Sequence, residues 1–161
     1  VSGAGNAIFV EGANDTLTAG GGTIALDATG AVLTTTAAST VNLANNVVAT
    51  VNAGGFADLV TVGTNDTLTL TNNGAGTSVT VAGGGDTIAV SNAKVTFSGN
   101  GAGGADTLTG SNDQITLSGG NQIVTVNGVP NGPIVVSGTN DTLTINAGGA
   151  SGTVLVSGVQ D

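Results

Sequence analysis

Two copies of one heptapeptide lie in this chain: Gly63-Thr64-Asn65-Asp66-Thr67-Leu68-Thr69 and Gly138-Thr139-Asn140-Asp141-Thr142-Leu143-Thr144. The longer segments around them, Val60–Gly83 and Val135–Gly158, align without a gap. A shorter form, Asp-Thr-apolar-Thr or Ala, is found at Asp15–Thr18, Asp66–Thr69, Asp86–Ala89, Asp106–Thr109 and Asp141–Thr144. A phrase that recurs at near-regular intervals indicates one supersecondary unit stacked on copies of itself.

The composition predicts strands around a thin core. The chain has 161 residues, of which 29 are Gly and three are Phe, and it contains no Trp, Tyr, Met or Cys. Its Val, Leu, Ile and Ala residues stand in short alternating runs, which are typical of half-buried strands. Since no apolar run approaches the length that spans a bilayer, we expect no membrane insertion.

The charge balance excludes several classes of function. Ten acidic residues face one basic residue, Lys94, and the net charge is −9, so the chain cannot neutralise nucleic-acid phosphates. The absence of Cys excludes disulfides and thiolate metal sites. With no His, Cys or Tyr, nucleophilic or general-base chemistry could rest only on carboxylates. We therefore expect no enzyme, no catalytic residue and no organic cofactor.

Two interleaved series of apolar residues mark the inward side of the strands. The first series is Ile8, Ile24, Val41, Val60, Val79, Val95, Ile115, Ile134 and Val154, and it has a second inward column two residues on, from Val10 to Val156. The second series is Leu17, Leu33, Ala49, Leu68, Ile88, Leu108, Val124 and Leu143. Within either series successive members lie 16 to 20 residues apart, which fits two strands per coil with polar corners between them.

A coil of three strands and about 27 residues also fits the raw spacing. The Asp-Thr phrase decides between the two, because all five copies fall in the second series, whereas a three-strand cycle would scatter them over three faces. The sequence therefore predicts an all-β chain. We expect residues 1–161 to form a single β-solenoid (parallel β-helix) without obvious capping segments, with about two strands and 16–20 residues per coil and roughly eight coils.

The residues that flank the second series point outward and are mostly threonines. The predicted array comprises Thr16, Thr18, Thr34, Thr50, Thr67, Thr69, Thr87, Thr107, Thr109, Thr125, Thr142 and Thr144. Thr is a good strand residue on an exposed face, so the array needs no ligand. It also resembles the Thr-x-Thr faces of hyperactive antifreeze solenoids, which implies ice binding. A third interpretation is a face that contacts another copy or a partner.

Asp66, Asp86 and Asp106 are predicted to form one column, because they lie 20 residues apart. Like charges at one strand spacing repel by roughly 1 kcal/mol in water. Polar or backbone N–H partners at the corner, a raised pKa or a bound calcium ion would relieve this repulsion. The segment 101–108 resembles the calcium-binding nonapeptide of RTX repeats, with Ala102 in place of the second Gly, and this resemblance implies calcium as the only possible cofactor.

In composition and repeat pattern the whole chain resembles the Gly/Thr/Asn/Asp-rich β-solenoid regions of secreted bacterial surface proteins, such as adhesins, hemagglutinin-like repeats and RTX-like proteins. The resemblance implies an extracellular, cell-surface structural element. The first hypothesis is therefore a self-assembling fibre subunit or adhesin stalk, whose partners are copies of itself joined through the solenoid ends. The second is an ice-binding protein, and the third is a calcium-stabilised repeat module. A chain cut from a longer array is an alternative explanation of uncapped ends.

Overall fold

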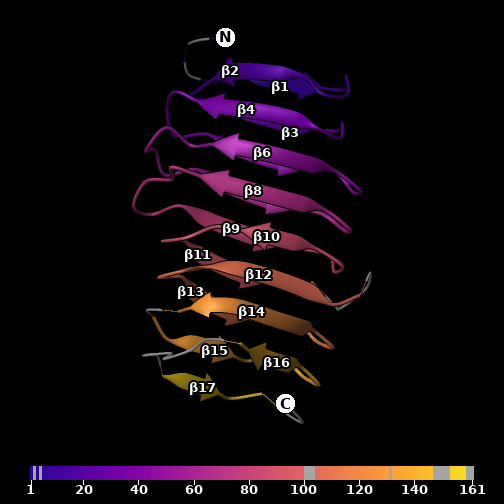
Figure 1. Ribbon diagram of the computed structural model, residues 1–161, viewed down its shortest axis with the longest axis vertical. Helices are drawn as coiled ribbons and strands as arrows, with labels where there is room; N and C mark the ends of the chain where they lie inside the picture. Colours follow the sequence, from indigo (N-terminus) through magenta and orange to yellow (C-terminus); the bar gives the residue numbers. More distant parts are fainter. Residues whose placement is uncertain (2, 4, 100–103, 131, 147–152, 159–161) are drawn as a thin grey trace.

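A computed structural model describes the chain except for residues 2, 4, 100–103, 131, 147–152 and 159–161. Figure 1 shows strands stacked into a rod, with the two ends of the chain at opposite ends of the stack. The described residues form strands, turns and bends and no helix. Accordingly, no helix in this part of the chain could cross a membrane. The predicted all-β class is confirmed.

The strands form two parallel sheets, in which odd-numbered strands pair with odd and even with even. The described residues of the first sheet, called the odd sheet, give β1 (Ala7–Val10), β3 (Thr23–Leu26), β5 (Thr40–Leu43), β7 (Leu59–Val62), β9 (Ser78–Val81), β11 (Lys94–Phe97), β13 (Gln114–Leu117), β15 (Ile134–Val136) and β17 (Val154–Val156). Those of the even sheet give β2 (Thr16–Ala19), β4 (Ala31–Thr35), β6 (Val48–Asn52), β8 (Thr67–Thr71), β10 (Thr87–Ala89), β12 (Asp106–Ser111), β14 (Ile123–Val129) and β16 (Thr142–Ile145). Each coil contributes one strand to each sheet.

The solenoid has about 7 turns of about 19 residues, each with two strands. The prediction of two strands per coil is confirmed, and the expected number of roughly eight coils agrees with the about 7 turns found. Every strand pair in the described part of the chain is parallel. Each coil therefore buries its apolar side chains only against its own second strand and against the coils above and below.

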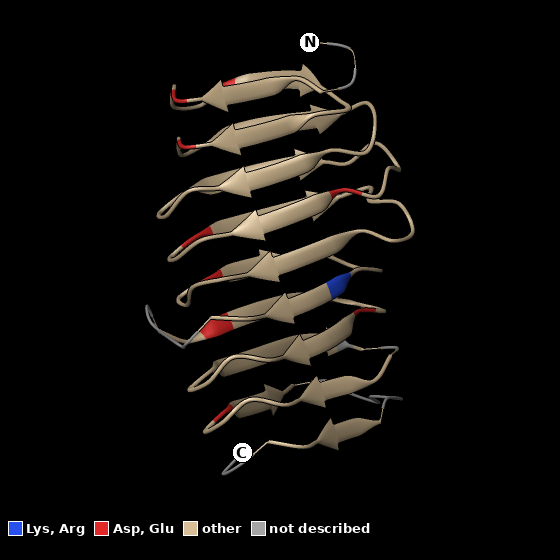
Figure 2. Ribbon diagram, turned by 180° about the vertical axis from the view of Figure 1, so that it is seen from behind, with Lys and Arg blue, Asp and Glu red and all other residues tan. Residues whose placement is uncertain are grey.

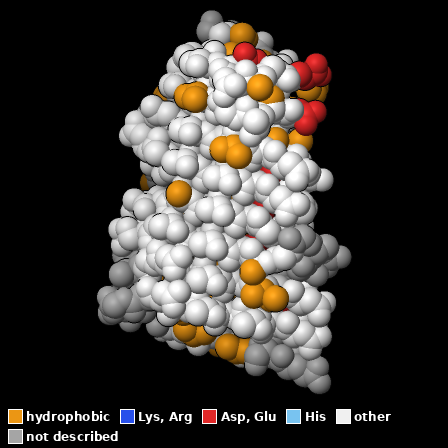
Figure 3. All heavy atoms as spheres, turned by 45° about the vertical axis from the view of Figure 1, so that its right-hand side comes forward, with side chains coloured by type: hydrophobic (Ala, Val, Ile, Leu, Met, Phe, Trp, Pro, Cys, Tyr) orange, Lys and Arg blue, Asp and Glu red, His pale blue; other side chains and the backbone are white. Residues whose placement is uncertain are grey.

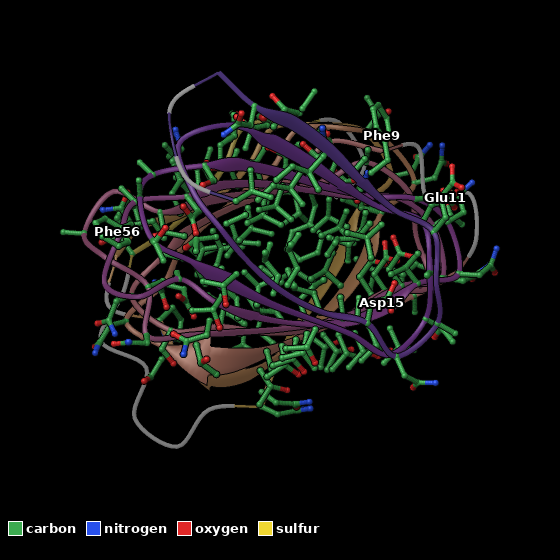
Figure 4. All side chains as sticks on the ribbon, turned by 90° about the horizontal axis from the view of Figure 1, so that it is seen from above. Phe9, Glu11, Asp15 and Phe56 are labelled. Carbon is green, nitrogen blue, oxygen red and sulfur yellow. The ribbon has the colours of Figure 1, made fainter. Side chains whose placement is uncertain are left out.

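The core is the narrow space between the two sheets, and it is filled by the predicted inward columns. Seen along the axis, side chains fill the interior, while Phe9, Glu11 and Phe56 point away from it (Figure 4). The first series is in register throughout, from Ile8 paired with Ile24 to Ile134 paired with Val154. Members in the middle of the rod are fully buried, and only those in the end coils are partly or largely exposed.

The register of the even sheet differs from the prediction at two places. Leu33 pairs with Val51, not with Ala49, and Leu108 pairs with Val126, not with Val124. Both shifts are of two residues. A shift of two leaves inward residues inward, because the side-chain period of a strand is two. The alternating pattern is therefore satisfied equally by either register, and the lengths of the neighbouring corners decide between them.

Candidate functional site

In two of the corners that lead from the odd sheet to the even sheet, an Asn comes just before the last residue of the corner. These residues are Asn65 and Asn140, whose φ angles are 58° and 57°. Asn adopts this left-handed conformation more readily than most residues with side chains. The residues that follow, Asp66 and Asp141, are 1% and 6% exposed. The Asn-Asp pair therefore turns the chain and places a carboxylate inside.

The predicted aspartate column exists, and its members are buried. Asp66, Asp86 and Asp106 are each 1% exposed. The N–H of Asp66 donates to Oδ1 of Asp86 at 2.7 Å, and the N–H of Asp86 donates to Oδ1 of Asp106 at 2.9 Å. Asp66 in turn accepts from Val47 and from Gly63, both at 2.7 Å. Each carboxylate thus occupies the place that a main-chain carbonyl has within the strands.

Three further aspartates do the same, and of these the sequence interpretation had named only Asp141, in the Asp-Thr phrase. Asp58 accepts from the N–H of Ser39 at 2.8 Å, Asp113 from Ala93 at 2.9 Å, and Asp141 from Gln122 at 2.9 Å. The donors lie 19 or 20 residues before the acceptors. One signal could have found all three, because each aspartate stands directly before a strand.

Burial raises the pKa of five of the buried carboxyl groups, those of Asp58, Asp66, Asp86, Asp106 and Asp113. Desolvation is the largest cause at Asp58, Asp66 and Asp106, where the accepted hydrogen bonds oppose it. Desolvation, against the lowering effect of the Asp66 N–H and together with the charges of Asp106 and Asp66, raises the pKa of Asp86 to about 6. At Asp113 desolvation raises the pKa to about 6 against the bond from Ala93. The column therefore holds groups that resist ionisation.

The hydrogen bonds explain the column without a cation. Of the relief mechanisms considered above, backbone N–H partners and a raised pKa are both present. Among the described residues, no group of three or more His, Cys, Asp or Glu side chains could hold a metal ion. Residues 101–103 of the RTX-like segment lie outside the described residues. Calcium binding by Asp66, Asp86 and Asp106 stays a prediction.

Two glycines, Gly110 in β12 and Gly119 in a corner, allow the coils to approach closely. A Cβ on Gly110 would lie 1.5 Å from the carbonyl oxygen of Val90, and one on Gly119 would lie 1.7 Å from that of Gly99. Neither glycine has a positive φ. Both positions therefore require Gly because the previous coil leaves no space for a side chain. Any larger residue would have to push the two coils apart.

The predicted threonine array lies on the outer face of the even sheet, and none of its twelve members is buried. The two register shifts divide it into more than the two columns expected. One column is Val48, Thr67, Thr87, Thr107, Thr125 and Thr144, and beside it run Thr16, Val32, Thr50, Thr69, Ala89, Thr109 and Asn127. Neighbours in a column are about 4.8 Å apart. The face is a flat hydroxyl and methyl array without a charged side chain on these positions.

The odd sheet carries a threonine column of its own, which the sequence interpretation missed. Its central outward positions are Phe9, Ala25, Asn42, Thr61, Thr80, Thr96, Thr116, Val135 and Leu155. The signal was available, because these residues lie between the two predicted inward columns. Threonine is therefore the preferred outward residue on both sheets, which supports a role in strand pairing for many of these side chains.

Asparagine side chains form short ladders along the corners and strand ends. The donor and acceptor pairs are Asn65–Asn46, Asn72–Asn52, Asn112–Asn92, Asn140–Asn121 and Asn146–Asn127, at distances from 3.1 to 3.4 Å. In each pair the later residue donates its Nδ2–H to Oδ1 of the earlier one. Stacked amides of this kind reinforce the main-chain ladder from coil to coil.

Charged and apolar side chains form few clusters on the surface. In Figure 2 acidic residues lie mainly along one edge of the stack, and the single blue residue marks Lys94. Figure 3 shows one side of the rod, on which hydrophobic side chains form small separate spots. Phe9, at 75%, is the most exposed large apolar side chain in the part of the chain that the structure describes. A groove of about 490 Å³ beside the short strand β10 is lined by Thr, Asn, Ser and small apolar residues, without a charge.

The last described coil is apolar and open. A cavity of about 230 Å³ is lined there by Val136, Asp141, Leu143, Ile145, Val154 and Val156. The three residues of β17 are 48%, 56% and 55% exposed. Positions of the repeat whose side chains are buried in the middle of the rod are therefore partly accessible to solvent in this coil.

Comparison of the chain with protein-family models, with curated proteins and with solved structures gave no match. The fold and the geometry of the corners and faces are accordingly the basis for any functional argument.

Proposed function

We propose that this chain is an extracellular structural protein that assembles end to end, as a fibre subunit or an adhesin stalk at the cell surface, and that it carries out no catalysis. One observation carries the proposal: neighbouring coils make the same set of contacts along the rod. Parallel strand pairs, amide ladders and carboxylate to N–H bonds recur from coil to coil. A coil can make the same contacts with a coil of another copy.

The last described coil supports this mode of assembly. Leu143, Ile145, Val154 and Val156 line its cavity, and the strand edges of β16 and β17 have no further strand beside them among the described residues. Pairing with the end of a second copy would cover these side chains and continue both ladders. Such a contact is heterologous, so it produces an open filament and not a closed dimer.

The extracellular location is supported by the composition. The chain has no Cys, Met, Trp or Tyr and one basic residue, so it contains few side chains that are readily oxidised and one site for trypsin-like cleavage. These properties suit a persistent structural element outside the cell. The resemblance to secreted bacterial surface proteins points the same way.

Negative-stain electron microscopy of the full chain at neutral pH tests the assembly. Val156→Lys places a charge at the apolar end, whereas Ile123→Lys places one on an outward position of β14, which lies between β12 and β16 and where Ile123 is 50% exposed. We expect filaments for the parent chain and for Ile123→Lys, and short or single particles for Val156→Lys. Particles that stay monomeric for all three variants would refute end-to-end assembly.

Ice binding is the second candidate, favoured by the threonine column on the even sheet. Thr67, Thr87, Thr107, Thr125 and Thr144 are consecutive partners in register, and none is buried. Regular hydroxyl and methyl groups on a flat, uncharged face present a repeating surface to ordered water. The odd sheet supplies a control column of the same composition over fewer coils, Thr61, Thr80, Thr96 and Thr116.

Thermal hysteresis measurements separate this candidate from a plain structural face. If ice binds to the even sheet, Thr107→Lys removes most of the hysteresis, while Thr96→Lys leaves it unchanged. Equal loss in the two variants would indicate that the even sheet has no special role. A parent chain that shows the hysteresis of an unrelated control protein would eliminate ice binding altogether.

A further inference from the structure

We propose that the corner column contains a proton-binding site at Asp86, where the buried Oδ2 carries a proton, so that folding of the solenoid is coupled to the uptake of this proton. Asp86 is 1% exposed, and its Oδ1 accepts the N–H of Asp66 at 2.7 Å. Its Oδ2 is also buried and has no hydrogen-bond partner among the described residues. A charged oxygen in this position is costly, and a proton removes the charge.

The number of N–H donors distinguishes Asp86 from its two neighbours. Asp66 accepts from the N–H groups of Val47 and Gly63, and the N–H of Asn46 also lowers its pKa. Asp106 accepts from the N–H of Asp86, and the N–H of Gly85 also lowers its pKa. Among the described residues, only the N–H of Asp66 acts on Asp86 in this way. Since N–H donors stabilise the ionised form, the proton is held by the member with the fewest of them.

Like charges face Asp86 from both sides along the rod axis. Asp66 precedes β8 and Asp106 begins β12, and each has a carboxylate that repels the ionised form of Asp86.

Across the core, β9 and β11 end on Val81 and Phe97, which carry no charge. Lys94 begins β11 at the opposite corner and is exposed. No basic group of the described residues therefore faces Asp86 to favour its ionised form.

The raised pKa of Asp86 agrees with this geometry and sets the pH range over which the proton stabilises the fold. Burial raises the pKa of Asp86 from 3.8 to about 6. The folded chain then binds more protons than the unfolded chain between these two values, so the stabilisation is complete below about pH 3.8 and is lost as the pH rises through about 6. This shift changes the folding equilibrium constant by roughly 100-fold at most. The site therefore makes the rod more stable in mild acid than at neutral pH.

The test is the pH profile of unfolding for the full chain and two single variants. Asp86→Asn keeps an oxygen that accepts the Asp66 N–H and places a neutral NH₂ where the protonated oxygen lies. Asp27→Asn removes one negative charge from an exposed side chain and is the matched control. We expect Asp86→Asn to unfold at a higher temperature than the parent at about pH 7.5, to match it near pH 4, and so to have a flatter profile. The melting temperature of Asp27→Asn should change with pH in parallel with that of the parent.

Parallel profiles for Asp86→Asn and the parent would overturn the proposal. Should Asp86→Asn fail to fold, the side-chain carboxyl carbon of Asp86 in the parent reports the site directly by NMR. A titration midpoint near 6 supports the proposal, and a midpoint below about 4.5 refutes it.

A divalent cation is the competing ligand for the same oxygen. Unfolding of the parent and of Asp86→Asn at neutral pH, in calcium chloride and in EDTA, distinguishes the two. We expect calcium to shift both proteins equally. A stabilisation by calcium that the parent shows and Asp86→Asn lacks would mean that the column binds a cation in place of a proton, and the proposal would be wrong.

Discussion

The backbone N–H of Asp86 donates to Oδ1 of Asp106, which lies 2.9 Å away in the next coil. The same relationship joins a donor and an aspartate 19 or 20 residues later at Asp58, Asp66, Asp86, Asp106, Asp113 and Asp141. Aspartate before a strand is therefore a structural element of the coil, and the next coil supplies the acceptor that the corner of the previous one needs.

Replacing Asp106 by Ala leaves the N–H of Asp86 buried without its acceptor. We expect Asp106→Ala to lower the free energy of unfolding by about 1 to 3 kcal/mol, the usual cost of an unsatisfied buried donor. Asp106→Asn keeps an oxygen and should cost less. Urea unfolding of both, with Asp27→Ala as the control at an exposed position, gives the comparison. Equal losses for Asp106→Ala and Asp27→Ala would contradict the role of the hydrogen bond.

Phe97 is the largest fully buried side chain, with an exposed fraction of 0%. Its truncation opens a cavity in a core only two side chains thick, so Phe97→Ala should lower the free energy of unfolding by about 3 to 5 kcal/mol. Phe9 has the same side chain but is 75% exposed, and Phe9→Ala should change it by less than about 0.5 kcal/mol. Calorimetric melts of the two variants measure this difference in stability. Equal losses of stability would mean that the central coils are loosely packed.

The contact between Gly110 and the coil before it leaves no room for a methyl group. A Cβ there would lie 1.5 Å from the carbonyl oxygen of Val90, so Gly110→Ala forces the two coils apart. We expect a loss of about 3 kcal/mol or more. Gly120→Ala is the control, since its Cβ would meet the Oγ1 of Thr139 at 3.1 Å and this side chain can rotate. Similar melting temperatures for the two variants would show that the coils separate easily.

Asp113 adds a second pH dependence at the opposite corner. Desolvation raises its pKa from 3.8 to about 6, so its contribution to stability is complete below about pH 3.8 and is lost as the pH rises through about 6. Asp113→Asn removes the charge and keeps an acceptor for Ala93. It should stabilise the chain at about pH 7 by on the order of 1 kcal/mol or more, and leave it unchanged at about pH 4. Denaturant titrations at the two pH values check the sign; a variant that is less stable at neutral pH contradicts it.

Trypsin should cut the native protein very slowly. Its single site follows Lys94, the chain's one basic residue, and Lys94 begins β11, which is paired with β9 and β13. Cleavage requires local opening of this strand. We expect an intact band under native conditions and the fragments 1–94 and 95–161 after denaturation. Rapid cleavage of the folded chain would mean that β11 opens far more often than a central strand should.

The alternation of side chains predicted the odd sheet residue by residue. Ile8, Ile24 and Val41 were assigned to one column, and they are consecutive partners in the structure. Strand pairing in a coil of nearly constant length leaves little freedom, so the spacing of these residues determines their neighbours. In the even sheet the same reasoning assigned Ala49 to Leu33, and the pairing is with Val51.

The candidate sites likewise have some features that the sequence predicts and others that depend on the tertiary structure. The outward orientation of the threonines follows from alternation, and all twelve predicted members lie on the surface. The grouping of Thr67 with Thr125 does not, because it depends on the register shift between β12 and β14. Asp66, Asp86 and Asp106 were placed in one column from their spacing, but their burial and their N–H donors depend on the backbone path of the corner.

The amino-acid sequence by itself determined that this protein is a two-strand β-solenoid, which residues point inward, and that aspartates recur at its corners. These follow from periodicity, which acts at short range along the chain. Only the tertiary structure decided the register of the even sheet, the grouping of Thr67 with Thr125 in one continuous column, and the difference between Asp86 and Asp66. The physical reason is that a shift of two residues preserves the inward and outward pattern, while the environment of a carboxylate depends on the donors that the neighbouring coils bring to it.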